Sequence, residues 1–147
     1  MLKFAIVGCG RIARRHSDLL GDKQIKGAKL VAVADTKTDR AQAIGEAKNV
    51  PSYDDMHEMM AKEKPDVVTV LTESGSHADH VLELATYGAD VVVEKPMALT
   101  LEDADKMIET CDRHSVRLFV VKQNRFNVPV VELRKALEAG RFGKLVL

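Results

Sequence analysis

Short apolar runs alternate with segments of helical periodicity along the whole chain. Five of these runs have the length and composition of strands: residues 4–7, 30–34, 67–71, 91–93 and 118–121. Each run is apolar throughout rather than at every second position, which is typical of strands that are buried on both faces of a sheet.

The segments between these runs carry apolar residues at helical spacing. The predicted helix faces hold Ile12, His16 and Leu19; Ala41, Ile44 and Ala47; Val81, Leu82 and Ala85; Ala104, Ile108 and Cys111; and Val130, Leu133 and Leu137. Residues 52–66 are expected to form an amphipathic, methionine-bearing helix or a loop that packs on the sheet. Strands that alternate with helices predict an α/β fold with a doubly wound, mostly parallel sheet in a single domain.

Composition narrows the class of protein. The 147 residues suffice for one domain with a proper core, and 22 basic residues balance 22 acidic ones. This balance gives the whole chain no electrostatic attraction to nucleic acid or to an anionic membrane. Cys9 and Cys111 are expected to be free thiols, and neither a signal peptide nor a membrane-spanning run is visible. We therefore expect a cytoplasmic protein.

Two glycines separate the first predicted strand from the first predicted helix. Gly8, Gly10 and Ala13 match G-x-G-x-x-A, in which the glycines allow a tight turn and close approach of a pyrophosphate, and the alanine allows close helix packing. The helix N-terminus offers free amides and a partial positive charge to the phosphates. Asp35 directly follows the second predicted strand, where an acid binds the adenosine ribose. This combination predicts a dinucleotide-binding Rossmann fold.

Asp35 also bears on the choice of cofactor. Its carboxylate would repel the 2′-phosphate of NADP, so NAD is the expected cofactor. Lys37 and Arg40 lie nearby in the sequence, and they would either offset part of this repulsion or remain solvated.

A second informative stretch, Glu94-Lys95-Pro96, follows the fourth apolar run. Ligands of open α/β sheets bind at the carboxyl ends of the strands, so this ionisable pair is predicted to lie in the site. The alternative is an ordinary surface ion pair at a strand end.

Several motifs together resemble the N-terminal half of the Gfo/Idh/MocA family, the group of glucose–fructose oxidoreductase and inositol dehydrogenase. They are GCGRIA with His16, Asp35, LTESGSHADH, Glu94-Lys95-Pro96, QNRF and EAGRFGKL. The resemblance covers the whole chain. Residues 119–145 look most like one branch, whose members oxidise the 3-hydroxyl of UDP-N-acetylglucosaminuronate in bacterial surface-polysaccharide biosynthesis.

The resemblance implies roles for individual residues. Lys95 would lie beside the reacting carbon, orient the substrate hydroxyl and take part in its proton transfer, while Glu94 would face the cofactor ribose. The loop at residues 72–77 would pass over the cofactor phosphate and the nicotinamide ribose. The expected cofactor contacts are Gly8, Gly10, Arg11, Ile12, Asp35, Thr72, Glu73, Ser74, His77, Glu94, Lys95 and Gln123, and the expected substrate contacts are Lys95 and Arg125.

Some of these residues have structural alternatives. His77 is either a cofactor contact or a residue that stabilises a helix N-terminus, and Arg125 is either a contact or a helix-surface residue. His16 is expected to be a packed, hydrogen-bonded histidine. No metal site is expected, because His57, His80 and His114 lack ligand spacing with one another or with the cysteines.

The resemblance also divides the chain. Residues 1–125 would form the dinucleotide-binding domain, and residues 126–147 a crossover helix and the first strand of a truncated C-terminal α+β domain. In the family that second domain supplies substrate contacts, further acid–base residues and the oligomer interface. The implied protein is an NAD-dependent sugar or sugar-nucleotide dehydrogenase that forms a homo-oligomer. The alternatives are an inositol or other sugar dehydrogenase and a non-catalytic nucleotide-binding module.

Overall fold

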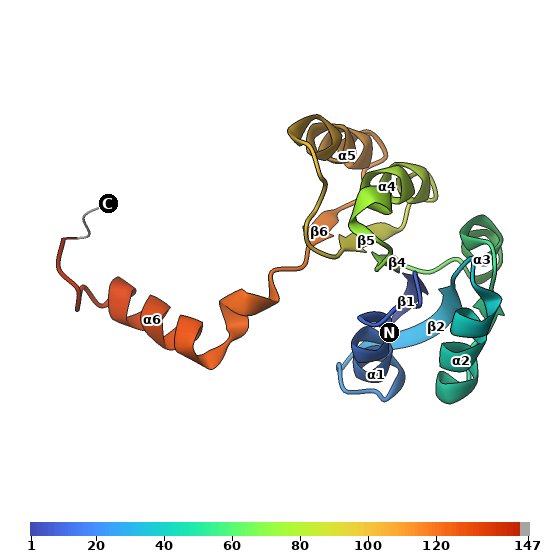
Figure 1. Ribbon diagram of the computed structural model, residues 1–147, viewed down its shortest axis with the longest axis horizontal. Coiled ribbons are helices and arrows are strands. Elements are labelled where there is room, and N and C mark those ends of the chain that lie inside the picture. Colours follow the sequence, from blue (N-terminus) through green and yellow to red (C-terminus); the bar gives the residue numbers. More distant parts are fainter. Residues whose placement is uncertain (145–147) are drawn as a thin grey trace.

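A computed structural model describes residues 1–144 as one six-stranded parallel sheet with helices on both faces (Figure 1). The strands are β1 (Leu2–Val7), β2 (Ala28–Ala34), β3 (Ser52–Tyr53), β4 (Val67–Val70), β5 (Asp90–Val93) and β6 (Leu118–Val120). Their order across the sheet is β3-β2-β1-β4-β5-β6. This arrangement confirms the predicted doubly wound α/β fold.

In the described part of the chain, five helices occupy the connections between strands, and a sixth follows β6. They are α1 (Ala13–Gly21), α2 (Thr38–Lys48), α3 (Met56–Glu63), α4 (His77–Ala85), α5 (Leu101–Arg113) and α6 (Val128–Glu138), with short 3₁₀ turns η1 (Ser74–Ser76) and η2 (Gln123–Phe126). None of the helices within residues 1–144 combines the length and the apolar character that crossing a membrane requires.

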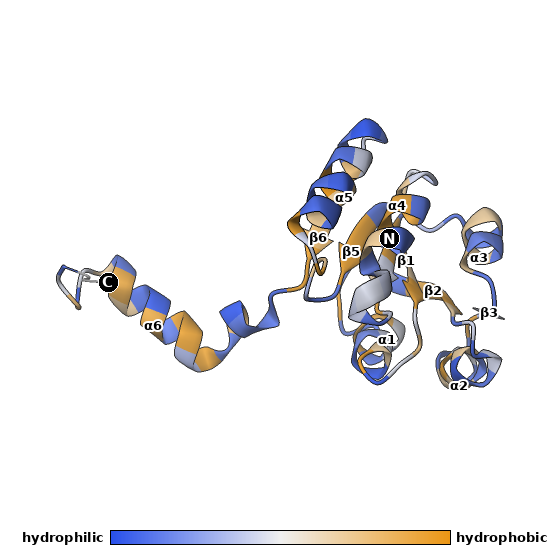
Figure 2. Cartoon of the chain, turned by 45° about the horizontal axis from the view of Figure 1, so that its top comes forward, coloured by the Kyte–Doolittle hydropathy of each residue, from blue (hydrophilic) through white to orange (hydrophobic). Residues whose placement is uncertain are grey.

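Two apolar clusters, one on each face of the sheet, form the core. The larger cluster joins the sheet to α3, α4 and α5, and its helical anchors Met59, Leu84 and Met107 are fully buried. The smaller cluster joins β1 and β2 to α1 and α2 through residues such as Ile6 and Leu20. Apolar residues therefore concentrate along the strands, as Figure 2 shows, and burial on both faces explains why the strand sequences do not alternate.

The predicted helix faces are buried at Ala41, Val81, Ala85 and Cys111, but in α1 and α5 one large residue of the predicted face is exposed and its neighbour is buried. Ile108 is 47% exposed and Ile12 is 40% exposed, although both were assigned to apolar faces. Met107 and Ala13 are fully buried instead. A helix presents to the sheet the residues that fit the space above the strands, so a small alanine can replace a neighbouring large residue at the contact.

The segment at residues 52–66 contains a strand that the sequence analysis missed. Ser52 and Tyr53 pair with the end of β2 as the short edge strand β3. The rest of the segment is the expected methionine-bearing helix, which begins where the Asp55 carboxylate accepts hydrogen bonds from the backbone amides of His57 and Glu58.

The helix α6 lies apart from the sheet (Figure 1). The predicted helix exists, but its apolar residues Val130, Leu133 and Leu137 are between 39% and 51% exposed. Figure 2 shows apolar and polar bands alternating along it. Within residues 1–144, therefore, nothing covers this face. The strand predicted at residues 145–147 lies outside the described residues.

Two leucine substitutions test the packing of the core. Leu84→Ala should lower the free energy of unfolding by about 2–5 kcal/mol, because Leu84 is fully buried between α4 and the sheet. The matched change Leu101→Ala removes the same atoms from a side chain that is 86% exposed. It should change the free energy of unfolding by less than about 0.5 kcal/mol. Urea denaturation followed by circular dichroism measures both, and equal effects would contradict the described core.

Candidate functional site

The site lies where the strand order reverses. β1 pairs with β2 on one side and with β4 on the other, so the chain leaves β1 and β4 toward opposite edges of the sheet. Such a switch point opens a crevice at the carboxyl ends of the strands. Gly8, directly after β1, has a φ of +92°, and a Cβ atom there would lie 2.7 Å from the backbone nitrogen of Thr72. The turn therefore requires glycine.

A groove of about 800 Å³ occupies this crevice. Seven of the predicted cofactor contacts line it: Gly8, Gly10, Arg11, Ile12, Asp35, Thr72 and Glu73. The sequence analysis did not assign several other lining residues, among them Thr36, Asp54, Asp55, Met56, His57, Ser76 and His80. The four residues from Asp54 to His57 follow the missed strand β3. These four residues could have been predicted as groove residues, because the carboxyl ends of parallel strands meet at the same edge of a sheet.

Asp35 holds the glycine turn from the neighbouring strand. Its carboxylate accepts hydrogen bonds from the backbone amides of Cys9 at 2.7 Å and of Lys37 at 2.8 Å. A carboxylate offers about four lone-pair positions, so further positions remain for ribose hydroxyls. Asp35 thus performs two tasks, because it orders the turn and presents acceptors to the groove.

The N-terminus of α1 faces the groove without a side-chain cap. Ile12 occupies the N-cap position, and the first turn contains no acidic residue. The helices α3 and α5, in contrast, begin with hydrogen bonds to Asp55 and Thr100. A Cβ atom at Gly10 would meet nothing within 4 Å, so this position has open space beside it. Uncapped amides next to open space form a suitable site for an anionic phosphate group.

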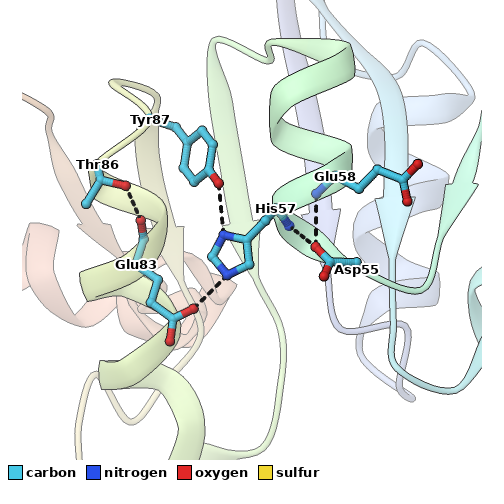
Figure 3. Close-up of polar contacts among 6 residues, drawn as sticks. All are labelled: Asp55, His57, Glu58, Glu83, Thr86 and Tyr87. Carbon is cyan, nitrogen blue, oxygen red and sulfur yellow. Dashed lines mark hydrogen bonds and ion pairs between the residues drawn. The ribbon is translucent and has the colours of Figure 1, made fainter.

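A polar bridge joins α3 to α4 and to Tyr87 just beyond α4 (Figure 3). The His57 ring lies 2.9 Å from the Tyr87 hydroxyl through Nδ1 and 2.9 Å from the Glu83 carboxylate through Nε2. With its proton on Nε2, His57 donates to Glu83 and accepts from Tyr87. The bridge connects two helices that each contribute a residue to the groove lining, His57 from α3 and His80 from α4.

Glu94 turns inward rather than toward the groove. It is only 7% exposed, and its Oε1 lies 3.1 Å from Nε2 of His16 on α1. Its Oε2 accepts a hydrogen bond from the Lys95 backbone amide at 3.1 Å. Glu94 does not line the groove, so its contact with a cofactor ribose remains a prediction. His16 is the hydrogen-bonded histidine that the sequence predicts.

His77 is also directed inward. It begins α4, is 1% exposed, and both ring nitrogens face backbone carbonyl oxygens. Nδ1 lies 2.7 Å from the Pro96 oxygen, and Nε2 lies 3.0 Å from the Thr72 oxygen. A neutral imidazole carries one N–H, so with its proton on Nδ1, the nitrogen of the shorter contact, His77 donates to Pro96 and Nε2 only lies against the Thr72 oxygen. Because both ring nitrogens lie against backbone oxygens, the geometry favours the structural alternative over direct contact with the cofactor.

The remaining predicted residues lie outside the groove lining. Lys95 is exposed beyond β5, and Ser74 begins the turn η1. Gln123 and Arg125 are exposed on η2, just beyond β6. The pairing of Val93 with Val120 brings the ends of β5 and β6 together. Their roles toward cofactor and substrate remain predictions.

The two cysteines are free and buried. Burial and the nearby Asp35 carboxylate raise the pKa of the Cys9 thiol to about 12, so it stays protonated at neutral pH and is a poor nucleophile. Across residues 1–144, no group of three His, Cys, Asp or Glu side chains is arranged to hold a metal ion.

Comparison with known proteins identifies the family. The sequence model described as an oxidoreductase family with an NAD-binding Rossmann fold matches residues 2–122. The chain belongs to the Gfo/Idh/MocA family. NAD is therefore the cofactor type for which this domain is built, in agreement with the glycine turn and Asp35.

Several family members are similar over nearly the whole chain. Myo-inositol 2-dehydrogenase of Thermotoga maritima is 33% identical over 97% of this chain and 42% of its own length. D-apiose dehydrogenase of Paraburkholderia graminis is 34% identical over 96% of this chain and 37% of its own length. The crystal structure of the WlbA dehydrogenase from Bordetella pertussis with NADH and UDP-GlcNAcA has a TM-score of 0.91 at 39% identity, covering 97% of this chain and 43% of that one. The chain thus spans about two fifths of these Gfo/Idh/MocA relatives.

Two glycine substitutions separate folding from cofactor binding. Gly8→Ala should lower the free energy of unfolding by about 1–3 kcal/mol, because it adds a Cβ against Thr72 at a positive φ. Gly10→Ala should leave that free energy within about 0.5 kcal/mol of the original value. It should nevertheless weaken NAD binding about tenfold, equivalent to about 1.4 kcal/mol, since it fills the space next to the uncapped helix. Thermal unfolding and calorimetric NAD titration measure the two effects, and a stable Gly8→Ala variant would contradict the described turn.

Proposed function

We propose that this chain is the cofactor domain of a dehydrogenase that transfers a hydride from a sugar hydroxyl carbon to NAD. The observation that carries the proposal is the position of Lys95, at the carboxyl end of β5 and next to the strand that borders the cofactor groove. The groove alone accounts only for cofactor binding. An exposed lysine beyond the adjacent strand places a reactive amine where a second molecule, the substrate, can reach it.

Lys95 would act on the proton of the substrate hydroxyl. Bound NAD would supply the acceptor for the hydride that leaves the carbon. The neutral Lys95 amine would hold the hydroxyl and accept its proton as the carbonyl forms, which balances the two-electron oxidation of the alcohol.

The proposed substrate is UDP-N-acetylglucosaminuronate, oxidised at C3 for surface-polysaccharide biosynthesis. The similarity to a WlbA dehydrogenase crystallised with UDP-GlcNAcA supports this proposal. A second groove at the end of β6 also supports it, because Lys122 and Arg125 line it and neither forms an ion pair within residues 1–144. Two such cations suit a substrate that carries a carboxylate and a diphosphate.

An uncharged polyol or sugar is the alternative substrate, since myo-inositol and D-apiose dehydrogenases are similar to the chain to a comparable extent. A panel of UDP-N-acetylglucosaminuronate, inositol and D-apiose would separate the candidates.

The remaining parts of the proposal are a cytoplasmic location, a homo-oligomeric complete protein, and a boundary near residue 125 between the cofactor domain and a second domain.

The first test concerns the choice of cofactor. We expect NAD to bind more tightly than NADP, because Asp35 accepts from the ribose and repels a 2′-phosphate. Asp35→Ala should weaken NAD binding by about 1–3 kcal/mol, the range for hydrogen bonds to a charged group. Calorimetric titration with both cofactors measures this, and Arg113→Ala, an exposed change at the end of α5, is the control. Equal affinity for both cofactors would refute the role of Asp35.

The second test concerns activity. The 147-residue chain should bind NAD but should form no NADH from UDP-N-acetylglucosaminuronate at a useful rate. Holding substrate against nicotinamide supplies about 7–11 kcal/mol of the barrier, and Lys95 alone cannot position a sugar nucleotide. In the complete gene product, Lys95→Ala should remove most of the turnover and leave NAD affinity nearly intact. NADH absorbance measures the turnover of the 147-residue chain and of the Lys95→Ala variant, and calorimetric titration measures NAD affinity. Turnover that survives Lys95→Ala would exclude Lys95 as the reacting group.

A further inference from the structure

We propose that His16 and His77 are positioning residues for Lys95, and that each joins a cofactor-binding segment to the backbone around Lys95. The proposal rests on the role of Lys95 in the proposed function. The two histidines come from different faces of the sheet, since α1 packs against the smaller apolar cluster and α4 against the larger one. Their links meet at adjacent residues after β5.

The first link runs through His77. The ring is buried, and it lies between the Thr72 oxygen in the groove lining and the Pro96 oxygen directly after Lys95. With its proton on Nδ1, the ring donates to Pro96, the nearer of the two oxygens. Burial of a polar ring is unfavourable unless it forms a hydrogen bond, so the bond to Pro96 explains why a histidine stands at this buried position.

The second link runs through His16 and Glu94. His16 lies on the helix that follows the glycine turn, and its Nε2 holds one carboxylate oxygen of Glu94. The other oxygen accepts from the Lys95 amide. The side chain of Glu94 is 9% exposed and that of His16 is 19% exposed, so the pair is largely shielded from water. It ties α1 to the amide of Lys95.

Together the links hold Lys95 from both sides. Glu94 fixes its amide, and His77 fixes the carbonyl of the next residue. Each link starts from a helix that borders the groove, namely α1 after the glycine turn and α4, whose His80 lines the groove. The position of Lys95 is thereby set relative to the bound cofactor, as hydride transfer requires.

Two substitutions of His77 separate its two contacts. Asn places its amide nitrogen where Nδ1 of histidine lies, so His77→Asn keeps the donor toward Pro96 and loses the contact with Thr72. Gln mimics Nε2, so His77→Gln does the reverse. In the complete gene product, we expect His77→Gln to lose about 10²-fold in kcat, the cost of a misplacement of about 1 Å. His77→Asn should stay within about tenfold of the parent kcat, and KM for NAD should change little in either variant.

His16 allows the same comparison. His16→Ala should lose kcat, and His16→Gln, which restores a donor at the Nε2 position, should recover most of it. Without cofactor, the Lys95 amide should exchange its hydrogen faster in His16→Ala than in the parent, because Glu94 is released. His114→Gln is the control, since His114 is exposed at the end of α5 and far along the chain from both links.

The outcomes distinguish this proposal from the proposed function. If Lys95→Ala abolishes turnover while the His16 and His77 variants keep the parent kcat, the positioning role is overturned and the dehydrogenase assignment stands. Equal loss of kcat in His77→Asn and His77→Gln would show that the hydrogen bond to Pro96 does not position Lys95, and the proposal would fail. It would also fail if thermal unfolding showed that loss of stability accounts for the effect in both variants. Loss in His77→Gln with retention in His77→Asn supports it.

Discussion

The close approach of Gly8 to the backbone of Leu71 and Thr72 is the contact on which the rest of the site depends. A Cβ atom at Gly8 would lie 2.7–2.9 Å from these backbone atoms, so only glycine lets the turns after β1 and β4 lie against each other. Both turns then contribute to one groove. The Cys9 amide donates to Asp35 from the first turn, and the Thr72 carbonyl lies against the His77 ring from the second. Separation of these turns would disturb both contacts together.

Hydrogen bonds between distant segments then define one arrangement of the strand ends. Among residues 1–144, no buried side-chain nitrogen or oxygen lacks a hydrogen-bond partner. A buried polar group that loses its partner costs about 1–3 kcal/mol, so alternative arrangements of the loops are disfavoured. Glu94 illustrates this, because one carboxylate oxygen is bonded to His16 on α1 and the other accepts from the Lys95 amide. Apolar packing of the sheet brings the strand ends together, and these polar contacts determine which loop lies where.

The sequence was sufficient for features that depend on local pattern. The doubly wound parallel sheet followed from alternation and crossover handedness, and the glycine turn and Asp35 followed from spacing along one βαβ unit. The strand β3 was missed because its two residues are too short to show a period. The partner of Glu94 was also beyond prediction, since His16 is 78 residues away and their contact depends on how α1 packs on the sheet. Periodicity located the helices, but the residue on each helix that meets the sheet depended on the shape of the core.

Under the proposed function, the order of strands matches the order of groups along a bound dinucleotide. Asp35 after β2 would hold the adenosine ribose, and the turn after β1 would hold the pyrophosphate. Thr72 after β4 would lie toward the nicotinamide end, and Lys95 after β5 comes next. Arg125 follows β6, one strand farther. A module that only senses NAD needs the first three positions, and gains nothing from a buried and a half-buried histidine that contact the segment around Lys95. Those contacts make physical sense if a second molecule reacts at Lys95, and they favour an enzyme over a binding module.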